Sequence, residues 1–232
     1  MTTLKFDPPQ LHALPIVGDD AGYPVNRVFC VGRNYAAHAA EMGGEVDREA
    51  PWYFTKSAQS ICQSGQTAPY PPGTSNYHYE MELVVALGKP VFRGNAGRAL
   101  DAVYGYACGL DMTRRDRQQD GKDNRRPWSL GKDVENSAVI GAITPRENFE
   151  DVSDQRIMLS VNDEIKQDAL ISDMVWSVPE IISHLSQYYH LQAGDLIMTG
   201  TPAGVGPVIA GDHLKGAISG LSDVELTIGA AE

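Results

Sequence analysis

The sequence predicts an α+β fold dominated by mixed β-sheet. Three observations indicate this class. Most periodic segments are short and either alternate between apolar and polar residues or are continuously apolar, as strands are. Only two or three segments have helical spacing, and all of them are short. Their order lacks the strict alternation of strand and helix that a doubly wound sheet requires.

The N-terminal half is expected to contain an arm, several strands and one short helix. Residues 1–25 are rich in Pro and Gly, so we interpret them as an arm or as short strands on the surface. Asn34 is expected to cap a helix that stops at Gly43 and Gly44. Strands are predicted at 27–31, 51–61, 76–89 and 102–112.

The C-terminal half is expected to contain a hairpin and further strands. Residues 113–126 are polar and are predicted to begin as a helix and continue as a loop. The segment 157–170 indicates a hairpin with its turn at Asn162 and Asp163, because both residue types tolerate turn conformations. Final strands are expected within 193–208 and 221–229.

The clearest helix signal begins near Ser177. Ser177 and Glu180 have the spacing of a capping box, and Pro179 fits the first turn of a helix. Apolar residues then recur at helical spacing and predict a stripe that faces the core. These residues are Ile181, Ile182, Leu185 and Tyr188.

Composition restricts the possible partners and the compartment. The formal net charge of −11 argues against a general affinity for nucleic acid or for an anionic membrane. No apolar run approaches the roughly 18 residues of a membrane span, and the N-terminus has no signal-peptide pattern, so a cytoplasmic protein is expected. The sequence contains an odd number of cysteines, and each lies in an apolar context, which favours buried thiols. These cysteines are Cys30, Cys62 and Cys108.

Two acidic residues, Glu80 and Glu82, stand at the beginning of an apolar strand. They lie on one face with Cα atoms roughly 6 to 7 Å apart, so their side chains can converge on one cation. Asp111 ends another apolar strand and adds a third oxygen ligand, a set that suits Mg²⁺, Mn²⁺ or Ca²⁺. An exposed polar face on an edge strand is the alternative.

His38 and Glu41 are neighbours on one face of the first helix. They suit a general base and the carboxylate that orients it, and an incidental surface pair is the alternative. Basic residues also gather between Arg114 and Lys132, and one or two of them directed into a pocket would hold an anionic substrate. The Gly-rich run at 200–206 lacks the ending of a phosphate loop.

Taken in order, five motifs resemble the fumarylacetoacetate hydrolase family. They are VGRNYAAHAAEMG, YHYEMELVVALGK, YGYACGLDMTRRDRQ, PWSLGKD and GDLIMTGTPAGVGPV. The resemblance implies a mixed β-sheet roll with a few short helices, an arm at 1–25, a catalytic domain at 26–232 and a homodimer. The sequence departs from the family pattern at one place: TKSAQSI stands after Phe54, where many relatives have a Lys-Pro pattern. The family pattern therefore does not specify the pocket wall around Lys56 and Ser57.

The resemblance also implies roles for individual residues. It implies a Mg²⁺ or Mn²⁺ site, a general base and its orienting carboxylate on a short mobile helix, and a lysine that contacts the substrate. The metal ligands would be Glu80, Glu82 and Asp111, the catalytic residues His38, Glu41 and Lys132, and the substrate-binding residues Arg33, Gln118 and Thr201.

The implied substrate is a small 2,4-dioxo acid. The whole-chain likeness is greatest to small bacterial members that hydrolyse fumarylpyruvate to fumarate and pyruvate in gentisate breakdown. His38 would take a proton from water, the resulting hydroxide would attack C4, and the metal and Lys132 would stabilise the enolate of pyruvate. Oxaloacetate decarboxylation, isomerisation of 2-oxo-diene dioates and a non-catalytic dicarboxylate-binding protein are the alternatives.

Overall fold

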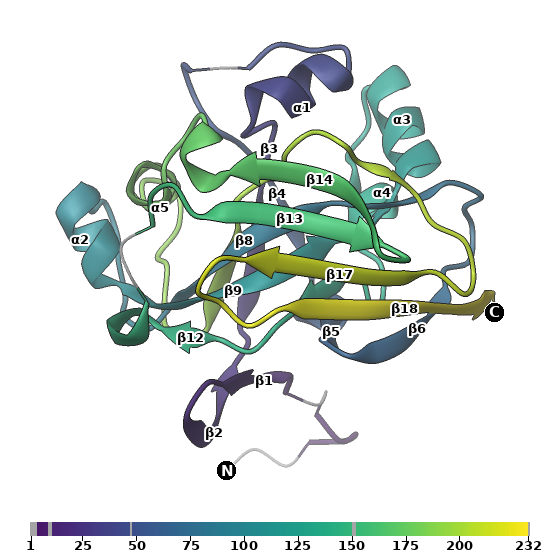
Figure 1. Cartoon of the computed structure of the whole chain (residues 1–232). Coiled ribbons are helices and arrows are strands. Elements are labelled where there is room, and N and C mark those ends of the chain that lie inside the picture. Colours follow the sequence, from purple (N-terminus) through teal and green to yellow (C-terminus); the bar gives the residue numbers. More distant parts are fainter. Residues whose placement is uncertain (1–3, 9–10, 47, 150–151, 232) are drawn as a thin grey trace.

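Two mixed sheets form the body of the molecule, with short helices along their rims (Figure 1). The computed structural model describes residues 4–8, 11–46, 48–149 and 152–231. Strands far outnumber helices and do not alternate regularly with them. The predicted α+β class is therefore confirmed.

The larger sheet contains both parallel and antiparallel neighbours. β15 pairs in parallel with β3 and antiparallel with β8, which pairs antiparallel with β9. In spatial order its strands are β4 (Trp52–Lys56), β3 (Arg27–Gly32), β15 (Asp195–Met198), β8 (Met81–Leu87), β9 (Val103–Asp111), β11 (Ala138–Ile140) and β5 (Ile61–Gln63), with β12 (Thr144–Pro145) also on β9.

A second sheet of five strands lies in front of the first in Figure 1. Its hairpin turns at Asn162 and Asp163, whose φ angles of 49° and 65° are those that Asn and Asp tolerate best, so the predicted turn is confirmed. Its strands, in order, are β14 (Glu164–Leu170), β13 (Arg156–Val161), β17 (His213–Ile218), β18 (Val224–Ala231) and β6 (Gln66–Tyr70).

Two small sheets and the helices complete the chain. One small sheet contains β10 (Thr113–Arg114), β7 (Tyr77–Tyr79) and β16 (Gly206–Pro207), and the other is the hairpin of β1 (Ala13–Ile16) and β2 (Asp19–Pro24). The helices are α1 (Ala36–Glu41), α2 (Ala96–Asp101), α3 (Arg115–Asp123), α4 (Ser129–Lys132) and α5 (Val178–Leu185), with 3₁₀ turns η1 (Ala58–Ser60), η2 (Arg146–Asn148) and η3 (Ile171–Asp173).

The helix ends test the predicted caps. Both hydrogen bonds of the Ser177–Glu180 capping box are present at the start of α5. Tyr188 was expected in its apolar stripe, but α5 ends at Leu185 and Tyr188 is 70% exposed, so that prediction is wrong.

Asn34 was expected to cap α1, and this prediction is also wrong. The residue before α1 is Tyr35, which makes no side-chain cap. Asn34 is fully buried, and its amide donates to the carbonyls of Trp176 and Thr199 and accepts from the Trp176 N–H. The side chain therefore connects the segment before α1 to two distant segments, since a buried amide needs all of these partners.

The strand period separates two hydrophobic clusters on either side of the larger sheet. Leu83 and Val85 of β8 belong to the cluster shared with the second sheet. Val84 of the same strand belongs to the other cluster, which includes Leu14 and Tyr23 of the N-terminal hairpin. Glu82 is two residues before Val84, so both side chains point to the same face of β8.

Candidate active site

Three acidic residues meet where β8 begins and β9 ends. Glu80 lies between β7 and β8, Glu82 is in β8, and Asp111 is the last residue of β9. The pairing of these strands brings the Asp111 N–H to 2.8 Å from the Glu80 carbonyl oxygen. One carboxylate oxygen from each residue lies within 4.8 Å of those from the other two. The predicted ligand residues therefore form one cluster.

The alternative of an exposed edge strand is wrong. β8 lies inside the larger sheet, between β15 and β9. Glu80 is 4% exposed, Glu82 is 1% exposed and Asp111 is fully buried. Buried carboxylates of this kind need compensating charge, because removing an anion from water costs several kcal/mol.

Three cations supply part of that compensation. Lys132 Nζ donates to Glu80 Oε2 at 2.7 Å and to Asp111 Oδ2 at 2.6 Å. Arg115 donates to Glu80 Oε1 at 2.5 Å. Lys56 Nζ lies 2.9 Å from Asp111 Oδ1, as an ion pair without hydrogen-bond geometry. Glu80 and Asp111 are therefore each held between two cations.

Glu82 has a different environment. Within the part of the chain that the structure describes it has no ion pair, and it accepts a hydrogen bond from the Gly200 N–H at 2.7 Å. Burial raises the pKa of Glu82 well above its usual value, and the charges of Asp111 and Glu80 raise it further. Burial acts in the same direction on Glu80, but Lys132 and Arg115 outweigh it and lower the pKa of that carboxyl.

The cluster fits a hard divalent cation. Three carboxylates provide the oxygen ligands that Mg²⁺ and Mn²⁺ prefer. Asp111 Oδ1 is buried without a hydrogen bond, and Glu82 lacks a cation of its own. A divalent cation would supply the charge that ionised Glu82 requires.

His38 and Glu41 form a pair on α1. His38 Nδ1 lies 3.2 Å from Glu41 Oε2, and the Gly204 N–H donates to Glu41 Oε1 at 3.1 Å. His38 is 7% exposed, so burial lowers its pKa below 6.5, while the charge of Glu80 and the hydrogen bond with Glu41 oppose this. His38 is therefore held in one orientation and stays neutral at neutral pH.

The three predicted substrate-binding residues lie close to these groups. Gln118 on α3 accepts from Arg115 at 2.7 Å, and Thr201 accepts from Gln167 at 2.9 Å. Arg33 follows β3 with a φ of 55°, and its guanidinium lies 4.2 Å from the centre of the Trp52 ring. A positive φ is costly for a residue with a side chain, and such strain gathers at functional sites.

A cavity of about 30 Å³ brings most of the predicted site residues together. Glu41 and Asp111 do not line it, but each contacts a lining residue, His38 and Lys132 respectively. The predicted residues that line it are Arg33, His38, Glu80, Glu82, Gln118, Lys132 and Thr201.

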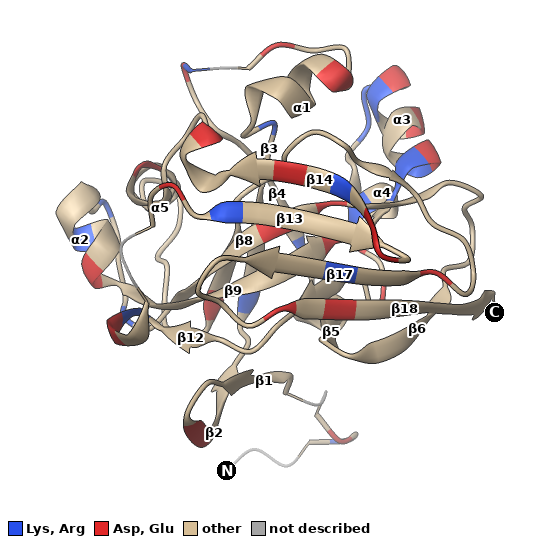
Figure 2. Ribbon diagram, in the orientation of Figure 1, with Lys and Arg blue, Asp and Glu red and all other residues tan. Residues whose placement is uncertain are grey.

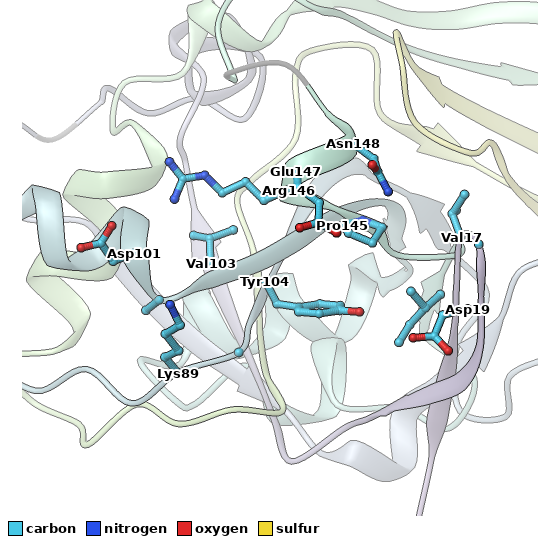
Figure 3. A pocket seen from close by; sticks show the side chains of 14 residues that line it. Val17, Asp19, Lys89, Asp101, Val103, Tyr104, Pro145, Arg146, Glu147 and Asn148 are labelled. Carbon is cyan, nitrogen blue, oxygen red and sulfur yellow. The ribbon is translucent and has the colours of Figure 1, made fainter.

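A larger cavity of about 600 Å³ lies elsewhere, beside the N-terminal hairpin (Figure 3). The side chain of Tyr104 lies across it, with Lys89, Asp101 and Arg146 on one side and Asp19 on the other (Figure 3). None of the predicted site residues lines it. The larger cavity is therefore not the one that the predicted site residues line.

Comparison with known proteins agrees with this geometry. Residues 27–229 match the family described as fumarylacetoacetate (FAA) hydrolase, C-terminal. This match spans most of the chain and includes every predicted site residue. The chain belongs to the fumarylacetoacetate hydrolase family.

Individual members of the family are similar over most of their length. A fumarylpyruvate hydrolase from Ralstonia sp is 52% identical over 193 residues, which cover 82% of this chain and 100% of that protein. Human mitochondrial oxaloacetate tautomerase FAHD1 is 41% identical over 194 residues, covering 84% of this chain and 87% of that protein.

Among solved structures, a fumarylpyruvate hydrolase from Pseudomonas aeruginosa in complex with Mn²⁺ and pyruvate superposes with a TM-score of 0.95. It is 43% identical, and the match covers 98% of this chain and 100% of that one. The fold of this chain is therefore that of the family.

Three cations of this family member were not assigned from the sequence. Lys56, Arg115 and Lys122 all lie at the site. Arg115 and Lys122 are three residues before and four residues after Gln118, so the helical period would have placed them on its face of α3. By the strand period, Lys56 shares a face of β4 with Trp52 and Phe54. The strand period does not show that its ammonium is buried, because the partners of the ammonium lie far along the chain.

Proposed function

We propose that the protein is a Mg²⁺- or Mn²⁺-dependent hydrolase that cleaves the C3–C4 bond of an acylpyruvate. The substrate is fumarylpyruvate, and the products are fumarate and pyruvate. One observation carries this proposal: the buried three-carboxylate cluster and the His38–Glu41 pair serve a single cavity. Such a cavity offers a place for a metal ion that a 2-oxo acid can approach, with a base beside it.

The metal would be held by Glu80, Glu82 and Asp111. When bound, it supplies a positive charge that favours the ionised, enolate-like form of a 2-oxo acid. Lys132 adds a fixed positive charge on the same carboxylates, donating to Glu80 and Asp111. Arg115 holds the other oxygen of Glu80 and the amide oxygen of Gln118, so it orients both side chains.

His38 moves the proton. Glu41 engages Nδ1, which keeps the proton on that nitrogen and leaves the lone pair of Nε2 free. Nε2 accepts a proton from water as the water oxygen bonds to C4 of the substrate. The C3–C4 bond then breaks with its electron pair on C3, and the proton held on Nε2 is returned to C3, which completes pyruvate. Lys132 stabilises the negative charge that develops on this fragment.

The similar proteins support this reaction. The 52% identical relative is named for fumarylpyruvate hydrolysis, and the neighbouring crystal structure holds Mn²⁺ and pyruvate, which is one of the expected products.

We further propose a cytoplasmic homodimer that acts in gentisate degradation. No helix in the described residues is long and apolar enough to span a membrane.

A second candidate is proton transfer on oxaloacetate without cleavage. Relatives named oxaloacetate tautomerase are 37% to 41% identical to this chain. The same cluster would hold oxaloacetate, and His38 would move a proton between carbon and oxygen. The higher identity of the Ralstonia protein favours hydrolysis.

A substrate panel tests the proposal. The purified protein is given fumarylpyruvate, acetylpyruvate and oxaloacetate with Mg²⁺, with Mn²⁺ and with a chelator. We expect metal-dependent loss of fumarylpyruvate with stoichiometric release of pyruvate, faster than any reaction of the other two. Enol–keto exchange of oxaloacetate without release of pyruvate from fumarylpyruvate would instead establish the tautomerase.

A matched pair of variants tests the base. His38→Gln is expected to reduce kcat by about 100-fold or more, the usual contribution of a general base. His213 is exposed, and His213→Gln provides the same change away from the site. Near-normal hydrolysis by His38→Gln would exclude His38 as the base.

A further inference from the structure

The site cavity contains two cations that the acidic cluster does not use. Arg33 and Lys122 both line it, and among the described residues neither forms an ion pair or a hydrogen bond with a carboxylate. Each lies instead over an indole ring: the Arg33 guanidinium over Trp52 at 4.2 Å, and Lys122 Nζ over Trp128 at 5.5 Å from the ring centre. These two cations are therefore available to an anion from outside the chain.

The other two cations that line the cavity are already engaged. Arg115 and Lys132 are paired with the acidic cluster, and Arg117 is paired with Asp116. Figure 2 shows this mixture of basic and acidic residues along α3. Of the four cations that line the cavity, Arg33 and Lys122 are thus the two without a carboxylate partner within the described residues. Arg126 lines the adjoining groove and not the cavity.

An aromatic groove of about 490 Å³ adjoins the cavity. Phe54, Trp128 and Lys132 line both spaces, so the two meet at these side chains. The Trp128 ring centre lies 6.5 Å from that of Trp52 and 6.0 Å from that of Phe54. A cavity of about 30 Å³ has room for little more than an ion or a water molecule, so the acyl end of a substrate must extend toward these rings.

The electrostatics of Lys122 match an anionic ligand. Burial lowers its pKa, and the charges of Arg115 and Arg33 lower it further, while Glu80 opposes the change. A cation that is partly removed from water and surrounded by other cations gains most from a nearby anion.

We propose that Arg33 and Lys122 bind the second carboxylate of the substrate, while Trp52, Phe54 and Trp128 contact its planar unsaturated chain. The protein then selects dicarboxylic acylpyruvates over those with an alkyl end. This inference rests on the proposed function and specifies its substrate class.

The experiment compares two substrates that differ at the acyl end. Fumarylpyruvate carries a distal carboxylate, and acetylpyruvate ends in a methyl group. Lys122→Met keeps the aliphatic stem over Trp128 and removes the charge. We expect KM for fumarylpyruvate to rise by about tenfold or more, with kcat nearly unchanged and with KM for acetylpyruvate nearly unchanged.

Two further variants make the result specific. Lys122→Arg keeps a positive charge and is expected to retain the preference for fumarylpyruvate. Lys89 is exposed and lines the distant cavity of Figure 3, so Lys89→Met removes one charge without touching the groove. Melting temperatures establish that each variant is folded, and Lys122→Gln replaces Lys122→Met if that variant does not fold.

Each outcome has one meaning. An equal rise in KM for both substrates would place Lys122 at the pyruvoyl end and overturn the inference, as would unchanged kinetics for both. Failure of the proposed function gives a different result, because the unmutated protein would then cleave neither fumarylpyruvate nor acetylpyruvate. That result would overturn the inference as well.

Discussion

His38 is subject to opposing electrostatic influences. Burial is the largest of them and lowers its pKa, while the charge of Glu80 and the hydrogen bond with Glu41 raise it. Arg115 acts in the same direction as burial. The net pKa lies below 6.5, so the imidazole is neutral and can accept a proton at neutral pH.

This balance predicts a pH dependence. Since a base must be unprotonated, kcat/KM is expected to be constant near neutrality and to fall with acidification through a pKa below 6.5. Glu41→Gln removes an influence that raises the pKa, so the acidic limb should move to lower pH while kcat falls. Glu45→Gln, at an exposed position on the same segment, is the control. An acidic limb that moves to higher pH in Glu41→Gln would contradict this account.

The residue scale also shows what sequence reasoning could reach. The strand period placed Glu80 and Glu82 on one face, and the family resemblance assigned Asp111 to the same metal site; the three side chains form one cluster. The ammonium of Lys56 is buried through partners at 111, 112, 132 and 137. No local pattern contains such a contact. Asn34 was assigned to a cap for the same reason, since its partners lie about 140 or more positions away.

Among the elements, the loop after β15 has a conformation that only glycine accepts easily. Gly204 has a φ of 96°, and a Cβ atom there would lie 2.1 Å from the Lys166 carbonyl oxygen of β14. Its N–H donates to Glu41, so this loop helps to position the partner of His38. The second sheet thus contributes to the site through backbone contacts.

Gly204→Ala tests that contribution. We expect unfolding to become easier by about 1–3 kcal/mol because of the backbone conformation and the clash, and we expect kcat to fall because Glu41 loses a donor. Gly211 has the same φ of 96° but nothing near its Cβ position, so Gly211→Ala isolates the conformational cost. Thermal melts and kinetics of both variants give the comparison. Equal effects on stability and activity would show that the contact with β14 is unimportant.

Elements with local signals were predicted best. The hairpin turn at Asn162 and Asp163 and the capping box at Ser177 depend on neighbouring residues, and both are present. Tyr188 continued the helical period, but α5 ends before it, because a period does not record where a helix stops. The order of strands within each sheet could be expected only from the family resemblance, since pairing partners lie far apart in the chain.

For the whole molecule, the cluster couples metal binding to stability. Glu82 is a carboxyl whose pKa lies well above its usual value, because burial and the charges of Asp111 and Glu80 favour its protonated form, and a bound cation would favour its ionised form. Metal bound to the folded state alone adds about 2.7 kcal/mol at 100 times the dissociation constant. For a chain of this length that corresponds to a rise in Tm of about 5–10 °C.

Glu82→Gln separates the two states. We expect it to abolish the Mn²⁺-induced rise in Tm and metal-dependent turnover, while the Tm of the metal-free protein is preserved. A neutral amide resembles the protonated carboxyl and still accepts from the Gly200 N–H. Glu164 is exposed, and Glu164→Gln is the charge-matched control. A full Mn²⁺ shift in Glu82→Gln would exclude Glu82 as a ligand.

The division of the site between chain segments has a consequence for how such enzymes diversify. The carboxylates lie at the beginning of β8 and the end of β9, and His38, the proposed base, lies on α1. The aromatic groove is built from β4 and the segment that leads into α4, and Lys122 projects from α3. On the proposed roles, mutations in the groove at positions other than Lys132 would therefore change the accepted acyl group and leave the carboxylates and His38 in place. New substrates would then be reached by single substitutions, each of which leaves those groups in place.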